Sequence, residues 1–163
     1  MLTNSVIMDI SKKAKIHFFY PDIRSSLSNT SELKLFIESI FRSEKRRLSS
    51  INYIFCSDKT ILEINKRYLN HDFYTDVITF NLSSNNKNVT AEVYVSIERV
   101  RDNAKKLGVS IKSELHRVLF HAALHLCGYN DKKKKDIEIM RKKEDVLLTK
   151  YFNPLVKFHG KRF

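Results

Sequence analysis

Short apolar segments and longer amphipathic segments alternate along this chain, and this alternation restricts its fold more than any other feature. Short runs rich in β-branched and aromatic residues predict strands, whereas apolar residues spaced three and four apart predict helices. The predicted strands are residues 15–20, 51–56, 76–80 and 91–96. The predicted helices are residues 30–46, 58–68, 98–107, 112–126 and 132–152. We therefore expect an α/β (α+β) fold with one small mixed sheet of about four strands packed with five or six helices.

Glycine and proline are scarce, with 3 and 2 residues in a chain of 163. Turn-dense sandwiches and barrels need more of both, so this scarcity favours long helices. The length suits one compact domain spanning residues 1–163. The polar stretch 83–90 reads as a loop, and the basic tail at about 153–163 as a flexible end.

The formal net charge is +12, and it is unevenly distributed. Residues 132–163 hold 11 basic and 4 acidic side chains, a net charge of +7. Such an excess suits a polyanionic partner, RNA or DNA ahead of an anionic membrane. From charge alone, a basic surface that merely keeps the protein soluble is an equally good reading.

Two sequence features concern the compartment. Cys56 and Cys127 are the only cysteines, which makes a disulfide framework unlikely and suits a reducing cytoplasm. The first twenty residues contain no signal-peptide core, and no uncharged apolar run reaches the roughly 18–20 residues that span a bilayer. We expect a cytoplasmic protein without a membrane partner.

The segment FHAALHLCGYNDK contains the residues most suited to chemistry. On a helix, His121 and His125 lie one turn apart on the same face, close enough to share one ion. Gly128 can end the helix in a left-handed conformation, so that the chain reverses and Asp131 approaches both imidazoles. Two imidazoles and a carboxylate suit zinc with one open position. Cys127 is a poorer ligand, since it lies off the shared face.

Other readings of these residues stay open. The two histidines could be ordinary residues of a half-buried helix, and Asp131 could instead cap the helix that follows. Thermolysin-type proteases carry a glutamate directly after the first histidine, where this chain has Ala122, which disfavours a protease of that type. The remaining histidines have no partner at metal spacing and read as structural or surface residues: His17, His71, His116 and His159.

The run HAALHLCGYND resembles the signature of the YbeY-type endoribonucleases, the rRNA maturation factors of bacteria. Their usual form is H-G-x-L-H-L-x-G-Y-D-H, which six residues here match: His121, Leu124, His125, Leu126, Gly128 and Tyr129. The segment TDVITF at 75–80 resembles the T-D-V-L-S-F segment of the family, and Met140 and Glu144 resemble its last helix. The resemblance spans about residues 50–148.

This resemblance implies a zinc-dependent endoribonuclease that hydrolyses single-stranded RNA. One zinc ion per chain would be held by His121, His125 and Asp131, which would act through a metal-bound water. The implied role is ribosomal RNA processing and small-subunit quality control in the cytoplasm, with ribosomal RNA and the small ribosomal subunit as partners.

The chain departs from the family pattern at several positions. The third ligand is usually histidine and here is Asp131, and Ala122 replaces a glycine. Leu69 stands where the family commonly has an arginine, and Ala91–Glu92–Val93 stands for G-D-I, so that the acid survives as Glu92. A carboxylate ligand can bind zinc, but it adds negative charge beside the RNA.

Basic side chains near the metal would hold phosphates, although for any single one a solvated helix face is the simpler reading. The candidates are Arg67, Arg99, Arg101, Lys105, Lys132 and Lys133. Four further residues could support a ligand or the substrate: Thr75, Asp76, Glu92 and Tyr129. Local capping of a strand is the alternative for Thr75 and Asp76, and packing of the turn is the alternative for Tyr129.

Two other functions remain open at this point. The first is a non-catalytic RNA-binding factor of ribosome assembly whose metal is structural. The second is a metallohydrolase for small molecules, which would need a narrow pocket and little of the positive charge.

Overall fold

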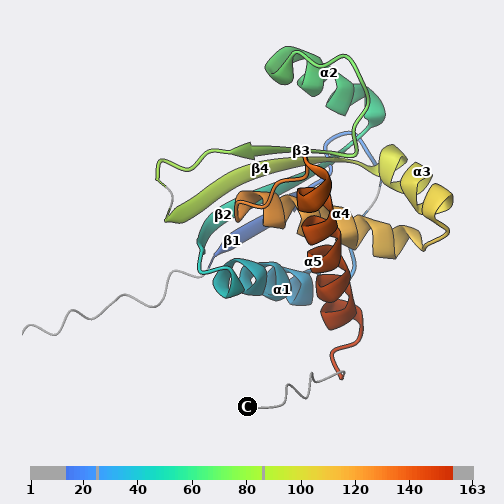
Figure 1. Cartoon of the computed structure of the whole chain (residues 1–163). Coiled ribbons are helices and arrows are strands. Elements are labelled where there is room, and N and C mark those ends of the chain that lie inside the picture. Colours follow the sequence, from blue (N-terminus) through green and yellow to red (C-terminus); the bar gives the residue numbers. More distant parts are fainter. Residues whose placement is uncertain (1–13, 25, 86, 156–163) are drawn as a thin grey trace, which may run out of the picture.

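A computed structural model describes residues 14–24, 26–85 and 87–155. Within these ranges four strands form one sheet in the order β1-β2-β4-β3 (Figure 1). The strands are β1 (Lys15–Phe19), β2 (Arg47–Cys56), β3 (Val77–Asn81) and β4 (Asn88–Ser96). β1, β2 and β4 run parallel, whereas β3 pairs with β4 in the antiparallel direction. The predicted mixed sheet of four strands is confirmed.

Five helices in the described part of the chain cover this sheet. They are α1 (Thr30–Ser43), α2 (Asp58–Leu69), α3 (Ile97–Leu107), α4 (Ile111–Leu126) and α5 (Lys134–Phe152). Figure 1 shows α1, α4 and α5 on one face of the sheet and α2 on the other. None of the described helices is both long enough and apolar enough to cross a membrane.

Two strands are longer than predicted. β2 begins at Arg47 and β4 at Asn88, so the last part of the predicted loop at 83–90 belongs to a strand. Leu48 and Val89 are buried and alternate with polar neighbours on these extensions. One buried residue per strand is enough to continue the period of two, but it is a weak signal in a polar stretch.

The residues that cap the helices differ from those that the sequence favours, which are Asn29 before the helix at 30 and Asp58 at the start of the next. Ser57 caps α2 by accepting a hydrogen bond from the Thr60 amide, whereas Asp58 lies in the first turn. α5 begins at Lys134, and its N-cap is Lys133 rather than Asp131. The alternative role of Asp131 as a helix cap is therefore wrong. Asn29 does precede α1, but its side chain makes no capping hydrogen bond.

The main core lies between the sheet and α1, α4 and α5. β2 contributes Ile51, Tyr53 and Phe55, and α4 contributes most of the side chains opposite them. Fully burying one large apolar side chain stabilises a fold by about 1.5–3 kcal/mol, so α4 is firmly seated. Residues on its remaining face consequently keep fixed positions relative to the sheet.

A candidate metal site between two cavities

α4 brings the two predicted histidines together. His121 and His125 lie on the one face of the helix that the core does not use, and their Nε2 atoms are 2.9 Å apart. A helix turn of 3.6 residues produces this proximity, because residues four apart lie above one another.

The turn after α4 brings in the carboxylate. Gly128 has a φ of 104°, a left-handed conformation that favours glycine. The Gly128 amide donates to the His125 carbonyl and the Tyr129 amide to the Leu124 carbonyl, which is the Schellman pattern of helix ends. The chain then reverses, and Asp131 Oδ2 lies 3.5 Å from His121 Nε2 and 3.3 Å from His125 Nε2.

Both imidazoles are oriented through their outer nitrogens. His125 Nδ1 donates to the Tyr129 carbonyl oxygen at 2.8 Å, and His121 Nδ1 donates to Glu144 Oε1 at 2.7 Å. A carbonyl oxygen and a carboxylate only accept, so in the neutral rings each Nδ1 carries the proton. Each Nε2 is then a bare acceptor. Such outer partners are typical of metal-ligating histidines.

The three atoms that face one another, the two Nε2 atoms and Asp131 Oδ2, therefore include no hydrogen-bond donor. Two imidazole nitrogens and one carboxylate oxygen face one another, an arrangement that is favourable only around a cation. Ligand atoms about 2.0–2.1 Å from a tetrahedral ion lie about 3.3 Å from one another, close to the separations found here. Among the described residues, His121, His125 and Asp131 are the group of three whose atoms can hold a metal ion.

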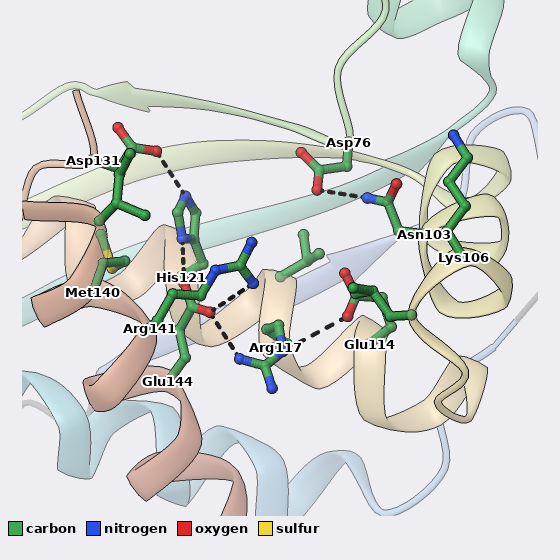
Figure 2. Close-up of a pocket in the computed structure, with 13 residues that line it drawn as sticks. Asp76, Asn103, Lys106, Glu114, Arg117, His121, Asp131, Met140, Arg141 and Glu144 are labelled. Atoms are coloured by element: carbon green, nitrogen blue, oxygen red, sulfur yellow. Dashed lines mark hydrogen bonds and ion pairs between the residues drawn. The ribbon is translucent and has the colours of Figure 1, made fainter. Parts of the chain in front are cut away.

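Glu144 of α5 is the key support of this group. Its residue is only 2% exposed, and its second oxygen accepts from Arg117 Nη1 at 2.9 Å (Figure 2). Burial alone would raise the pKa of Glu144, but the hydrogen bonds from His121 and Arg117 outweigh it and lower the pKa. The carboxylate is thus ionised at neutral pH and holds the His121 ring in place.

His121, His125 and Asp131, which we call the metal group, lie where two cavities meet. One cavity of about 420 Å³ extends among α3, α4 and α5 and includes Lys106, Arg117 and Arg141. The other, of about 590 Å³, follows the edge strand β3 to the loop between α2 and β3. Three residues line both cavities: Asp76, His121 and Asp131. An extended ligand can therefore lie across the metal group with one part in each cavity.

The structure separates the predicted RNA-binding residues. Lys132 lines the larger cavity. Arg99 is bound through its guanidinium to Asp58 Oδ2 at 2.8 Å, with its charge already paired. The other four are described as exposed and do not belong to the lining of either cavity: Arg67, Arg101, Lys105 and Lys133.

The residues predicted to support a ligand also fall into two groups. Thr75 and Asp76 line the larger cavity, and Asn103 holds Asp76 Oδ2 at 3.1 Å. Glu92 lies on β4 outside both linings and accepts from the Tyr94 hydroxyl. Tyr129 contributes its backbone carbonyl, whereas its hydroxyl donates to Glu44 at 2.8 Å. Of the two roles predicted for Tyr129, its side chain therefore has the packing of the turn.

The other predicted positions fit simpler roles. His116 is buried, and its ring stacks on Tyr151 with centroids 4.9 Å apart. His17 lies at the β1 edge and His71 on the surface of the larger cavity. His159 and residues 156–163 of the basic tail lie outside the described residues.

Sequence reasoning assigned no role to Glu144, Arg117, Asn103 or Glu114. One signal was available for α4: Glu114, Arg117, His121 and His125 follow one another at spacings of three and four in a helix that buries nine of its residues. A polar stripe of this kind on a buried helix marks a functional face. No comparable spacing joins Glu144 to His121, since 23 residues separate them.

Comparison with known proteins identifies the family of this chain. The family model described as endoribonuclease YbeY matches residues 22–152. The chain belongs to this family. The endoribonuclease YbeY of Cytophaga hutchinsonii is 43% identical over 138 residues, covering 85% of this chain and 96% of that protein. That of Amoebophilus asiaticus is 41% identical over 147 residues, covering 90% and 99%.

Family membership confirms the resemblance that the signature segment indicated. The fold agrees as well, since a Thermotoga maritima protein whose structure was determined in solution superposes with a TM-score of 0.59 at 26% identity. That match covers 90% of this chain and 99% of the other. Leu69, which the sequence resemblance led us to expect in place of an arginine, lines the larger cavity.

Proposed function

We propose that this protein is a zinc-dependent endoribonuclease that cleaves RNA at the His121–His125–Asp131 group. The convergence of three acceptor atoms at the meeting point of two cavities carries the proposal. Family membership supports the reaction, because the relatives above bear the name endoribonuclease. We include the whole of residues 1–163 in one domain.

Two imidazoles and a carboxylate form a donor set that zinc accepts. Structural zinc sites usually have four protein ligands, whereas three ligands leave a position open. This difference disfavours the non-catalytic assembly factor with a structural metal. A zinc ion bound here supplies Lewis acidity and a nucleophile at neutral pH.

The side chains of the protein position the metal ligands and neutralise the charge of the phosphates. Glu144 and the Tyr129 carbonyl hold the ligand rings so that both Nε2 atoms point inward. Asp76, held by Asn103, lies beside the metal group in both cavities and can accept a proton from a reacting water or hydroxyl group. Lys106 and Lys132 supply positive charge on either side for the phosphates that flank the cut.

The substrate is RNA, and we propose ribosomal RNA processing, with the small ribosomal subunit as partner, in the cytoplasm. The +12 charge supports a polyanionic substrate. Two cavities that open on either side of the metal group suit a chain cut in its interior. A small molecule would need only one of them.

A metal assay coupled to cleavage tests this function. Protein purified without a histidine tag should contain about one zinc per chain and cut single-stranded RNA. Chelation and His121→Ala should each abolish cleavage, and added zinc should restore only the chelated protein. His17→Ala, on the far edge of the sheet, is the matched control and should remain active. Equal cleavage by the His121→Ala protein would overturn the proposal.

A further inference from the structure

The loop between α2 and β3, residues 70–76, exposes large aromatic side chains. Phe73 is 57% exposed and Tyr74 is 54% exposed. The ring of His71 stacks on Phe73, with centroids 5.0 Å apart and planes 22° from parallel. Leaving such rings in water forfeits their burial energy, so a cluster of them marks a binding surface. We call residues 70–76 the aromatic loop.

The aromatic loop is held in its shape rather than left free. Asn65 of α2 is buried, its Nδ2 donates to the Phe73 carbonyl at 2.9 Å, and its carbonyl accepts from the His71 amide. Lys66 pairs with Asp72 at 2.9 Å across the same bend. A pre-ordered surface loses little conformational entropy when a ligand binds, which favours a role in recognition.

The loop and the metal group line the same larger cavity. His71, Phe73 and Thr75 line this cavity together with His121, His125 and Asp131. β3 runs between them as an edge strand, so its outer backbone groups have no partner strand in the described sheet. A ligand on the aromatic loop therefore continues directly to the metal group.

Cations accompany the exposed rings. The Arg99 guanidinium, whose charge Asp58 pairs, lies 5.2 Å from the centroid of Tyr74, and just before the loop the guanidinium of Arg67 lies 5.5 Å from the centroid of Tyr68. Lys132 lines the cavity between the loop and the metal group. Rings beside positive charges match a ligand with flat faces and a polyanionic backbone, which is an unpaired nucleic acid strand.

We propose that the aromatic loop is a stacking platform for unpaired bases of the RNA beside the cut, with Phe73 and His71 as the base contacts. The assignment rests on the proposed function for the identity of the strand. Bases in a duplex are covered by their neighbours, so such a platform selects unpaired RNA by its accessible ring faces. Leu69, at the end of α2, lines the same cavity as these aromatic contacts.

Binding measured without cleavage tests the platform separately from the reaction. The full chain is treated with a chelator and titrated with a labelled twelve-nucleotide oligouridylate, an abasic oligomer of equal length, and a duplex. Phe73→Leu should weaken binding of the oligouridylate about tenfold, whereas Phe73→Tyr should retain it. Binding of the abasic oligomer should not change, since it has phosphates but no bases.

A matched control lies on the opposite edge of the sheet. Phe19 is 47% exposed and lies 6.0 Å from the His17 ring, so it repeats the histidine–phenylalanine pair away from the metal group. Phe19→Leu should leave every affinity unchanged. Equal weakening of oligouridylate binding by both variants, or equal loss for the abasic oligomer in Phe73→Leu, overturns the platform.

Two further readouts separate this proposal from its alternatives. If the unmodified protein loaded with zinc does not cleave RNA but still discriminates between oligouridylate and abasic oligomer, the reaction is refuted and the platform is kept. If Phe73→Leu instead changes the oligomeric state of the protein on size exclusion and leaves RNA binding unchanged, the loop is a protein interface and the platform is refuted.

Discussion

The walls that the two cavities contribute beside the metal group are built in opposite ways. The helical wall, formed by α4 and α5, buries its charged residues and pairs them, as Glu144 does with His121 and Arg117. The loop wall, residues 70–76, leaves rings in solvent on a braced backbone. Precision matters where ligand atoms must meet within a few tenths of an ångström, and accessible surface matters where a variable strand must stack.

Among the tests of this comparison, substitution of Glu144 has the largest expected effect. Glu144→Gln removes the charge that orients His121 and should reduce zinc affinity or activity by about 10- to 100-fold. Asp145→Asn is the matched control, because Asp145 also binds Arg117 but is largely exposed. Zinc titration of both variants, with the activity of each, gives the answer. Similar losses in the two would show that burial of the helical wall carries no special role.

A smaller effect, on the stability of the fold, is expected at Glu44, which binds the turn that carries Tyr129. Glu44 accepts from Lys143 and from the Tyr129 hydroxyl, at 2.6 and 2.8 Å. Burial by itself raises the pKa of Glu44, but the bonds from Lys143 and Tyr129 prevail and lower it from its ordinary value of 4.5. A lowered carboxyl pKa adds stability above the unfolded value, and this stability is lost as pH falls through the folded value.

Glu44→Gln should therefore lower the free energy of unfolding by about 1 kcal/mol at pH 7, and the difference should shrink as pH falls below about 4.5. Denaturant unfolding at several pH values measures it. Glu138→Gln, on the exposed side of α5, is the control and should show little effect at any pH. A difference that grows as pH falls would contradict this account.

The smallest effect separates charge from stacking on the cavity walls. Lys132→Gln should reduce the slope of log affinity against log salt by about 0.7, the value for one phosphate contact on a single strand. Phe73→Leu should weaken binding without changing this slope. Lys105→Gln, an exposed position outside both cavity linings, should change neither. The salt dependence of RNA binding by the three variants thus separates the charge contact of Lys132 from the stacking contact of Phe73.

Local patterns predicted the metal group well. His121 and His125 are four residues apart on one helix, and the turn at Gly128 returns Asp131 within six residues of His125. Every step lies within about three helical turns, where spacing determines geometry. The same holds for the strands and helices, whose periods are local properties.

Support from distant segments could not be predicted in this way. Glu144 reaches His121 only because α5 packs against α4, and Tyr129 turns its side chain away because Glu44 lies beside it. Arg99 and Lys132 look alike as basic residues in sequence, yet only the folded chain places Asp58 against Arg99 and leaves Lys132 in the cavity. Charge alone cannot tell a paired cation from an available one.

The sequence by itself determined the α/β architecture, the positive charge and the three candidate metal ligands, because each depends on composition or on spacing within a short segment. Only the tertiary structure decided which carboxylate holds His121, which cations line the cavities, and that the aromatic loop shares a cavity with the metal group. Those relations join residues from separate elements. They depend on how the helices pack against the sheet, which no local pattern encodes.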